Sequence, residues 1–235
     1  MTGLERYPAV NAFGSFIEAP DSVYGTGSDG SATISANTSL TSDKFYYNLS
    51  IDSNIVLNTA GYRLFVKNLL TLSSNSTIGV GTTGVYSMTT GFSGVGTIRG
   101  GGGISGAVST SLGGNSATQS AIVPTAAEGG LTYWNQPVQA VRGYALNASS
   151  ATPTFLYGGA GGSSGVGGGV VIIAARYISA TSANIKATGA TGTNGGGGGV
   201  IILVSTYAAV PSEITTDVTG GTSCIAGTVI YSQLI

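Results

Sequence analysis

The sequence predicts an all-β protein whose short strands stack in a solenoid-like or sandwich-like arrangement and are joined by glycine-rich turns. Residues that favour helices are sparse, whereas Gly, Ser, Thr, Val and Ile, which favour turns and strands, dominate the chain. Glycine supplies 40 of the 235 residues, more than twice the usual share of about 7%. Charged residues make up only 7%, so the chain lacks the high charge of a disordered protein and must stay soluble through Ser, Thr, Asn and backbone groups.

Strand-like runs between turn residues fill the first third of the chain. Several of them alternate apolar and polar side chains, which is the period of a half-buried strand. Along 62–72 the apolar side chains change parity between Val66 and Leu69, which predicts a turn or bulge near Lys67–Asn68. The runs are SATISA (31–36), FYYNLSI (45–51), NIVLN (54–58), YRLFVKNLLTL (62–72) and STIGV (76–80).

Two weak internal repeats support stacking. GGVVIIA at 168–174 returns as GGVIILV at 198–204, and GTVIY at 227–231 is a third copy if Val229 matches Val200. Earlier in the chain, 48–61 resembles 68–81, since both segments begin with Asn-Leu and end in a glycine turn. Regular repeats made of short strands indicate units that bury their apolar strands on the next unit.

The glycine runs have a structural interpretation. Five glycines at 195–199 lead directly into the apolar strand VIILVS (200–205), although glycine loses more backbone entropy on folding than any other residue. We predict that these glycines form turns and corners at which backbone packs directly on backbone. A flexible linker is the alternative, but the fixed spacing between the glycine runs and the apolar strands disfavours it.

Two motifs resemble catalytic or cofactor signatures. GTGSDG at 25–30 matches a dinucleotide fingerprint, but strand-like residues follow it where that site needs a helix, and it matches only half of a calcium-binding repeat. We therefore expect a plain turn ending at Asp29–Gly30. GGSSG at 161–165 matches a nucleophile elbow centred on Ser163, but the chain has no histidine to act as the general base.

Composition disfavours several further classes. One cysteine, Cys224, and no histidine cannot form a zinc site or an internal disulfide, and we predict no metal and no cofactor. The net charge of −1 without a basic cluster disfavours nucleic acid, and the absence of a long apolar run disfavours membrane insertion. A paired-carboxylate glycosidase stays open. Its candidate residues are Glu5, Glu18, Asp21, Asp29, Asp43, Asp52, Glu128, Glu213 and Asp217.

The most function-like patch is aromatic and polar, and it lies in 82–157, a region that breaks the repeat pattern. Aromatic faces beside amide and guanidinium groups are typical of surfaces that contact sugars or proteins. The alternative is that Trp134 only packs a loop against the core. The receptor-contact candidates are Tyr133, Trp134, Asn135, Gln136, Arg142 and Tyr144.

The segment GTGSDGSATISANTSLTSDKFYYNLSIDSNIVLNTAGYRLFVKNLLTLSSNSTIGV (25–80), followed by glycine-plus-strand blocks at 165–174 and 194–204, resembles glycine-rich virion surface proteins of tailed bacteriophages. The resemblance covers 25–81 and 158–206. It implies a tail fibre, tail spike, minor tail or capsid-decoration protein, and a homotrimer. No catalytic residue carries over from it.

These observations give one prediction for the whole chain. The expected regions are an N-terminal attachment segment (1–24), a β-repeat region (25–81), a loop-rich insertion (82–157) and a glycine-rich β-repeat region (158–235). The expected function is non-enzymatic: a bacteriophage virion surface protein of the tail fibre or adhesin type that mediates attachment to the host cell. Capsid decoration is the alternative, and a polysaccharide-degrading tail spike is a distant one. The chain would be made in the host cytoplasm and would end on the virion surface. Its partners would be further copies of itself, other virion proteins and a host-cell glycan or protein.

Overall fold

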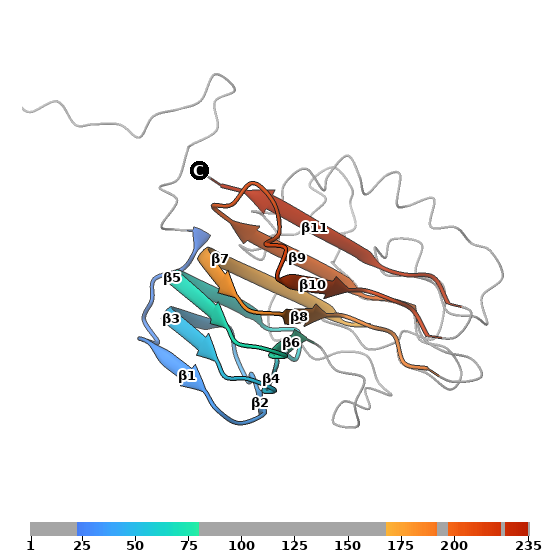
Figure 1. Cartoon of the computed structure of the whole chain (residues 1–235), viewed down its shortest axis with the longest axis horizontal. Helices are drawn as coiled ribbons and strands as arrows, with labels where there is room; N and C mark the ends of the chain where they lie inside the picture. The colour runs from blue at the N-terminus through green and yellow to red at the C-terminus, as the bar shows by residue number, and fades with distance from the viewer. Residues whose placement is uncertain (1–22, 80–167, 192–196, 222–223, 235) are drawn as a thin grey trace, which may run out of the picture.

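A computed structural model describes residues 23–79, 168–191, 197–221 and 224–234, and these residues form an all-β structure. Two parallel sheets make up the fold (Figure 1). The strands are β1 (Ala32–Ile34), β2 (Thr38–Ser39), β3 (Lys44–Ile51), β4 (Val56–Asn58), β5 (Arg63–Leu72), β6 (Thr77–Gly79), β7 (Val170–Ala180), β8 (Ala183–Lys186), β9 (Val200–Ser205), β10 (Ile214–Asp217) and β11 (Thr228–Gln233).

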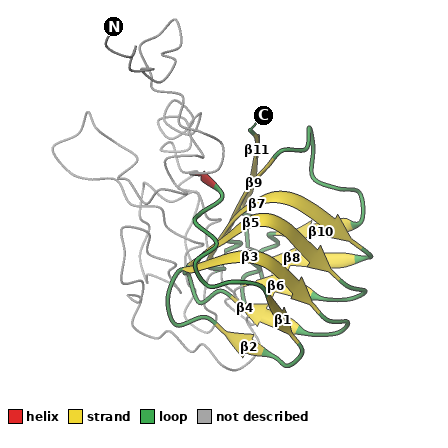
Figure 2. Cartoon of the chain, turned by 90° about the vertical axis from the view of Figure 1, so that its left-hand side faces the viewer, coloured by secondary structure: helices red, strands yellow, loops and turns green. Residues whose placement is uncertain are grey.

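Successive strands alternate between the two sheets. The six-stranded sheet has the order β1-β3-β5-β7-β9-β11, and the five-stranded sheet has the order β10-β8-β6-β4-β2. Each odd strand and the even strand after it therefore form one unit, and each unit pairs in parallel with the next one. Figure 2 shows the long odd strands as curved ribbons stacked beside the shorter even strands. The strands before 80–167 join directly to the strands after it, because β5 pairs with β7 and β6 pairs with β8.

The strand registers confirm one predicted repeat and correct another. Val170 pairs with Val200 and Ala174 with Val204, as the match between 168–174 and 198–204 predicts. The third copy is shifted by one residue, because Val229 pairs with Ile201 rather than with Val200. A shift of one residue exchanges the two faces of a strand. The observed register places Val229 against the cluster that contains Ile201, between the sheets.

The predicted irregularity near Lys67–Asn68 is a β-bulge. The register between β3 and β5 shifts after Tyr46, so that Tyr47 alone lies opposite Lys67 and Asn68. The register between β5 and β7 shifts at the same place, where Arg176 alone lies opposite these two residues. Before the bulge, Lys44 pairs with Leu64, which is 20 residues further along the chain. After the bulge, Asn48 pairs with Leu69, which is 21 residues further along.

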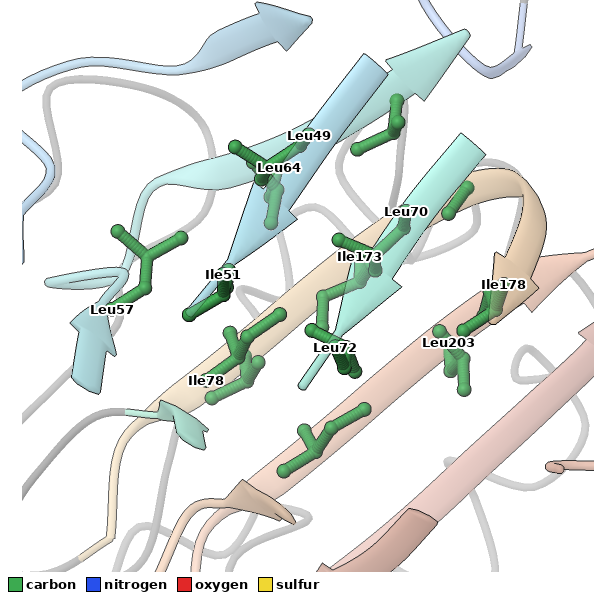
Figure 3. Packing of buried hydrophobic residues seen from close by; sticks show 14 of the residues in the cluster. Leu49, Ile51, Leu57, Leu64, Leu70, Leu72, Ile78, Ile173, Ile178 and Leu203 are labelled. Carbon is green, nitrogen blue, oxygen red and sulfur yellow. The ribbon is translucent and has the colours of Figure 1, made fainter. Parts of the chain in front are cut away.

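The main core lies between the two sheets. Leu49, Leu70 and Ile178 occupy equivalent positions on three neighbouring strands and are almost completely buried. Figure 3 shows Ile51 and Leu72 among the side chains of this core. Burying one such side chain contributes about 1.5–3 kcal/mol, so columns of this kind supply most of the energy that holds the sheets together.

A second apolar cluster lies on the other face of the six-stranded sheet. It includes Phe45, Phe65, Ile172 and Ile202, and the rings of Phe45 and Phe65 stack with centroids 4.7 Å apart. The middle strands of this sheet are therefore buried on both faces. This explains why β7 and β9 are continuous apolar runs rather than alternating ones.

The corners after β3, β5 and β7 reuse one backbone conformation. Asn54, Asn75 and Ser182 all have positive φ angles, of 62°, 59° and 54°. The Asn54 N–H donates to the Ser74 carbonyl (3.1 Å), and the Asn75 N–H donates to the Ser182 carbonyl (2.9 Å). Asn75 Nδ2 also donates to Asn54 Oδ1 at 3.4 Å. Asparagine tolerates this left-handed conformation better than most residues, so the corners stack without glycine.

The glycines before the apolar strands pack backbone on backbone, as the sequence predicts. A Cβ atom on Gly199 would lie 2.1 Å from the Gly169 carbonyl oxygen, and one on Gly198 would lie 1.8 Å from the Val218 oxygen. The Gly199 N–H donates to the Ala187 carbonyl at 2.7 Å. The two layers therefore approach too closely here for any side chain. Of the five-glycine run, 197–199 lie within the described residues.

Candidate binding surface

All the receptor-contact residues predicted from the sequence lie outside the described residues, as does Ser163. The predicted residues are Tyr133, Trp134, Asn135, Gln136, Arg142 and Tyr144. The candidate surface described below is built from other residues.

The strands β3 and β7, on either side of β5, interrupt their alternation opposite the bulge. In β3 the side chains of Tyr46 and Leu49 both belong to the core between the sheets, although two residues separate them. In β7 the core residues Ala175 and Ile178 are separated in the same way. Regular alternation would place two residues of this spacing on opposite faces. The residues between them therefore gather along one outer corner of the stack.

We call this corner the tyrosine ridge. It consists of Tyr47 from β3, Lys67 and Asn68 from β5, Arg176 and Tyr177 from β7, and Tyr207 just after β9. The three tyrosines are 47%, 41% and 40% exposed, and they are three of the five large hydrophobic side chains that are exposed among the described residues.

Two of these tyrosines lie where β7 and the end of β9 run side by side. The Thr206 N–H and Oγ1 both donate to the Arg176 carbonyl, at 3.2 and 2.6 Å. In this parallel sheet an N–H donates to the residue before its partner, as the Val200 N–H donates to Gly169 while Val200 pairs with Val170. The bond therefore places Thr206 opposite Tyr177, one residue out of the register that pairs Ala174 with Val204, and Tyr207 follows just past this point.

Hydrogen bonds and packing fix the rest of the ridge. Asn68 Nδ2 donates to Asn48 Oδ1 at 2.8 Å, and the Leu69 N–H donates to the same oxygen at 3.3 Å. Gly27, with φ +75°, lies against Tyr47 and Lys67, because a Cβ on this glycine would be 3.2 Å from Tyr47 Cδ2 and 3.4 Å from Lys67 Cδ. The side chains of Tyr47 and Lys67 therefore both pack beside Gly27.

The ridge carries positive charge. Lys67 and Arg176 are its charged members, and it contains no carboxylate. The Arg176 guanidinium lies over the Tyr177 ring, 5.6 Å from the ring centroid, in the geometry of a cation–π contact. This contact combines a cation and an aromatic face in one small area.

Two of the carboxylates considered for glycosidase chemistry bond the backbone of the next unit. Asp29 Oδ2 accepts a hydrogen bond from the Phe45 N–H at 2.7 Å. Asp43 accepts one from the Arg63 N–H at 2.8 Å and forms an ion pair with the Arg63 guanidinium. These contacts assign both residues a structural role, because each carboxylate satisfies a strand N–H at a corner.

The GTGSDG segment forms the expected turn. Gly25, Gly27 and Gly30 have positive φ angles, and the Gly30 N–H donates to the Gly27 carbonyl at 3.0 Å. Within the described part of the chain, no group of three or more His, Cys, Asp and Glu residues could hold a metal ion.

The buried Tyr24 and the half-buried Tyr231 lie behind the ridge. Tyr231 Oη donates to the Tyr207 carbonyl at 2.7 Å and lies 2.6 Å from Ser205 Oγ, so Ser205 is the donor in that second bond. Tyr24 Oη donates to the Leu234 carbonyl at 3.1 Å. Burial raises the pKa of Tyr24 to about 12, and burial also raises the pKa of Tyr231. Both phenols therefore stay protonated at neutral pH and remain donors.

The ridge could not be found by reading the sequence locally, because its members come from three strands and from the segment after a fourth, which are far apart in the chain. One signal was present: Tyr177 and Tyr207 are separated by the same interval as the repeated apolar strands that precede them. Extending that repeat beyond the strands would have placed the two tyrosines on neighbouring units, one residue away from the observed register.

Comparison of the chain with family models, with curated proteins and with solved structures finds no match. Among the residues that the structure describes, no helix is long and apolar enough to cross a membrane.

Proposed function

We propose that the two-sheet stack is a β-solenoid and that the protein is a non-enzymatic structural component of a bacteriophage particle surface. In this proposal it is of the tail fibre or adhesin type, assembles as a homotrimer and contacts the host cell. The proposal begins from the sequence resemblance of 25–81 and 158–206 to virion surface proteins.

The stacking of the units supports a rigid structural role. Each unit adds parallel strands to both sheets, buries apolar columns and closes its corners with hydrogen bonds to the next unit. Such a stack depends on local contacts between neighbouring units, so its length and its surface can change independently.

The tyrosine ridge is the observation that carries the binding part of the proposal. It places three exposed aromatic rings on a scaffold of paired strands, and binding surfaces are enriched in tyrosine because its ring offers contact area at low entropic cost. Exposed aromatic side chains that gather at one corner of a fold mark a candidate interaction site.

Electron microscopy of intact particles labelled with an antibody against the chain tests the proposal. We expect label at the tail tip or fibres, and we expect the mass of the purified chain in solution to be that of a trimer. Label on the capsid would replace the adhesin with a decoration protein. Absence of label from the particle would refute the virion assignment altogether.

A further inference from the structure

We propose that the tyrosine ridge binds an acidic glycan, which lies along the stack across successive units. This inference rests on the proposed function, because it names the chemical class of the ligand that the attachment surface would recognise. The argument has three parts: the exposed rings, the charge of the ridge and its rigidity.

The exposed rings suit sugar recognition. Tyr47, Tyr177 and Tyr207 offer flat apolar faces together with phenol groups that donate and accept hydrogen bonds. Asn68 contributes an amide at the same corner, and its position is fixed by the bond to Asn48. A sugar ring presents hydroxyl groups at its edge and C–H groups on its faces, so amide and aromatic groups side by side match both parts.

The charge of the ridge selects an acidic ligand. Lys67 and Arg176 lie among the tyrosines, and the nearby Asp29 carboxylate accepts a hydrogen bond from the backbone of β3. A sugar acid would place its carboxylate beside these cations, where charge-assisted hydrogen bonds are about twice as strong as neutral ones. Single-stranded nucleic acid also combines rings and charge, but its binding depends on many phosphate contacts. Two cations and a net charge of −1 favour the glycan.

The rigidity of the ridge favours a linear ligand. Neighbouring parallel strands are about 4.8 Å apart, so the side chains of the ridge recur at regular steps along the stack. Strand pairing holds the backbone of β3, β5 and β7 at the ridge, and the bonds from Thr206 to the Arg176 carbonyl hold the backbone next to Tyr207. A surface ordered before binding loses little entropy when the ligand arrives.

The test measures binding of the full chain to immobilised polygalacturonate, an acidic polysaccharide, and to dextran, a neutral one. We expect saturable binding to polygalacturonate, weakening as salt is added, and at least tenfold weaker binding to dextran. The variant Tyr177→Ala with Tyr207→Ala should bind polygalacturonate about tenfold or more weakly, whereas Tyr177→Phe, which keeps the ring, should lose less. Lys67→Gln should weaken binding and reduce its dependence on salt.

Two variants on the other sheet serve as matched controls. Val56→Ala removes an exposed apolar side chain from β4, and Lys186→Gln removes a cation from β8. Both should bind as the unchanged chain does. Circular dichroism of every variant verifies that the β-sheet signal is retained, and Tyr177→Phe keeps the test informative if the double variant does not fold.

The outcomes separate the inference from the proposed function. Equal binding to both polysaccharides, or unchanged binding by folded ridge variants, overturns the inference. Tighter binding to single-stranded oligodeoxythymidine than to polygalacturonate, lost in the same variants, overturns it in favour of nucleic acid. If the chain is found on the particle and adheres to host cells but does not bind polygalacturonate, only the glycan inference fails. If the chain is absent from the particle, the proposed function fails whatever the glycan result is.

Discussion

Replacing Gly199 by alanine tests whether backbone packing at the glycine corner holds the stack together. A Cβ at this position would meet the Gly169 carbonyl oxygen at 2.1 Å, the Gly168 carbonyl carbon at 2.6 Å and the Ala187 carbonyl oxygen at 2.9 Å. All three contacts are shorter than real Cβ contacts, and all three are with backbone atoms. No side chain can rotate away to relieve the clash, so the strands themselves must separate.

The expected cost follows from the bonds that this separation weakens. The Gly199 N–H donates to Ala187 (2.7 Å), the Val200 N–H donates to Gly169 (2.9 Å), and the Thr228 N–H donates to Gly199 (3.1 Å). Losing them costs about 1 kcal/mol each, and overpacking adds about 1–3 kcal/mol. Alanine offsets only about 0.4–1 kcal/mol of this loss of stability, because it reduces the entropy of the unfolded chain. We expect Gly199→Ala to destabilise the fold by about 3–6 kcal/mol.

Urea unfolding followed by circular dichroism measures this loss as a lower midpoint. Gly30→Ala is the matched control, because nothing lies within 4 Å of a Cβ at Gly30 and the cost there comes from its φ of +73°. That strain is worth about 1–2 kcal/mol. If Gly199→Ala lost no more stability than Gly30→Ala, the glycines would not be needed for close packing and the reasoning would be wrong.

Three other perturbations probe separate parts of the fold. Burial raises the pKa of Tyr24 from 10.0 to about 12. The stabilising contribution of its phenol is therefore complete below pH 10 and is lost as pH rises through about 12. Across this pH range, the urea midpoint of Tyr24→Phe should fall less than that of the unchanged chain. Asp43→Ala should lower stability by about 1.5–3 kcal/mol, because it removes charge-assisted bonds to Arg63, and Asp43→Asn should lose less because an acceptor for the Arg63 N–H remains. Equal losses in the two Asp43 variants would contradict this explanation. A Gly/Ser linker as long as 187–199 can replace 80–167. This variant should keep the β-sheet dichroism and cooperative unfolding, because β5 pairs directly with β7. Loss of cooperative unfolding would show that the stack depends on 80–167.

The sequence predicts the parts of the fold that depend on local chemistry. Alternating and apolar runs indicate the strands, and the change of parity near Lys67 predicts the bulge. The repeat that relates 168–174 to 198–204 predicts the pairing of β7 with β9, because both strands begin with the same glycine-and-valine pattern. These features depend on residues that are close together or regularly spaced, so they can be read directly.

The remaining features depend on long-range packing. The register of β11 was predicted one residue out because GTVIY matches GGVIILV almost equally well at two alignments, and only the faces of the neighbouring strands decide between them. The continuous apolar run of β7 indicates burial on both faces, but the sequence does not say what covers the outer face, because Phe65 and Ile202 come from other strands. The ridge is missed because Tyr47 and Tyr177 are brought to one corner by strand pairing alone.

The glycine corner and the tyrosine ridge lie toward opposite ends of the same strands, and this connects the stability of the stack to its proposed binding surface. Gly169 and Gly199 precede β7 and β9, and the register that begins there holds as far as Ala174 and Val204, after which the bond from the Thr206 N–H to the Arg176 carbonyl shifts it by one residue. Since a further slip would turn the end of β9 to the other face, the close glycine contacts help to fix where Tyr207 emerges beside Tyr177. A Gly199→Ala protein that still folds should therefore bind polygalacturonate more weakly, although no ridge residue has changed. Full binding by a folded variant would show that the ridge is aligned by the apolar strands without help from the glycines.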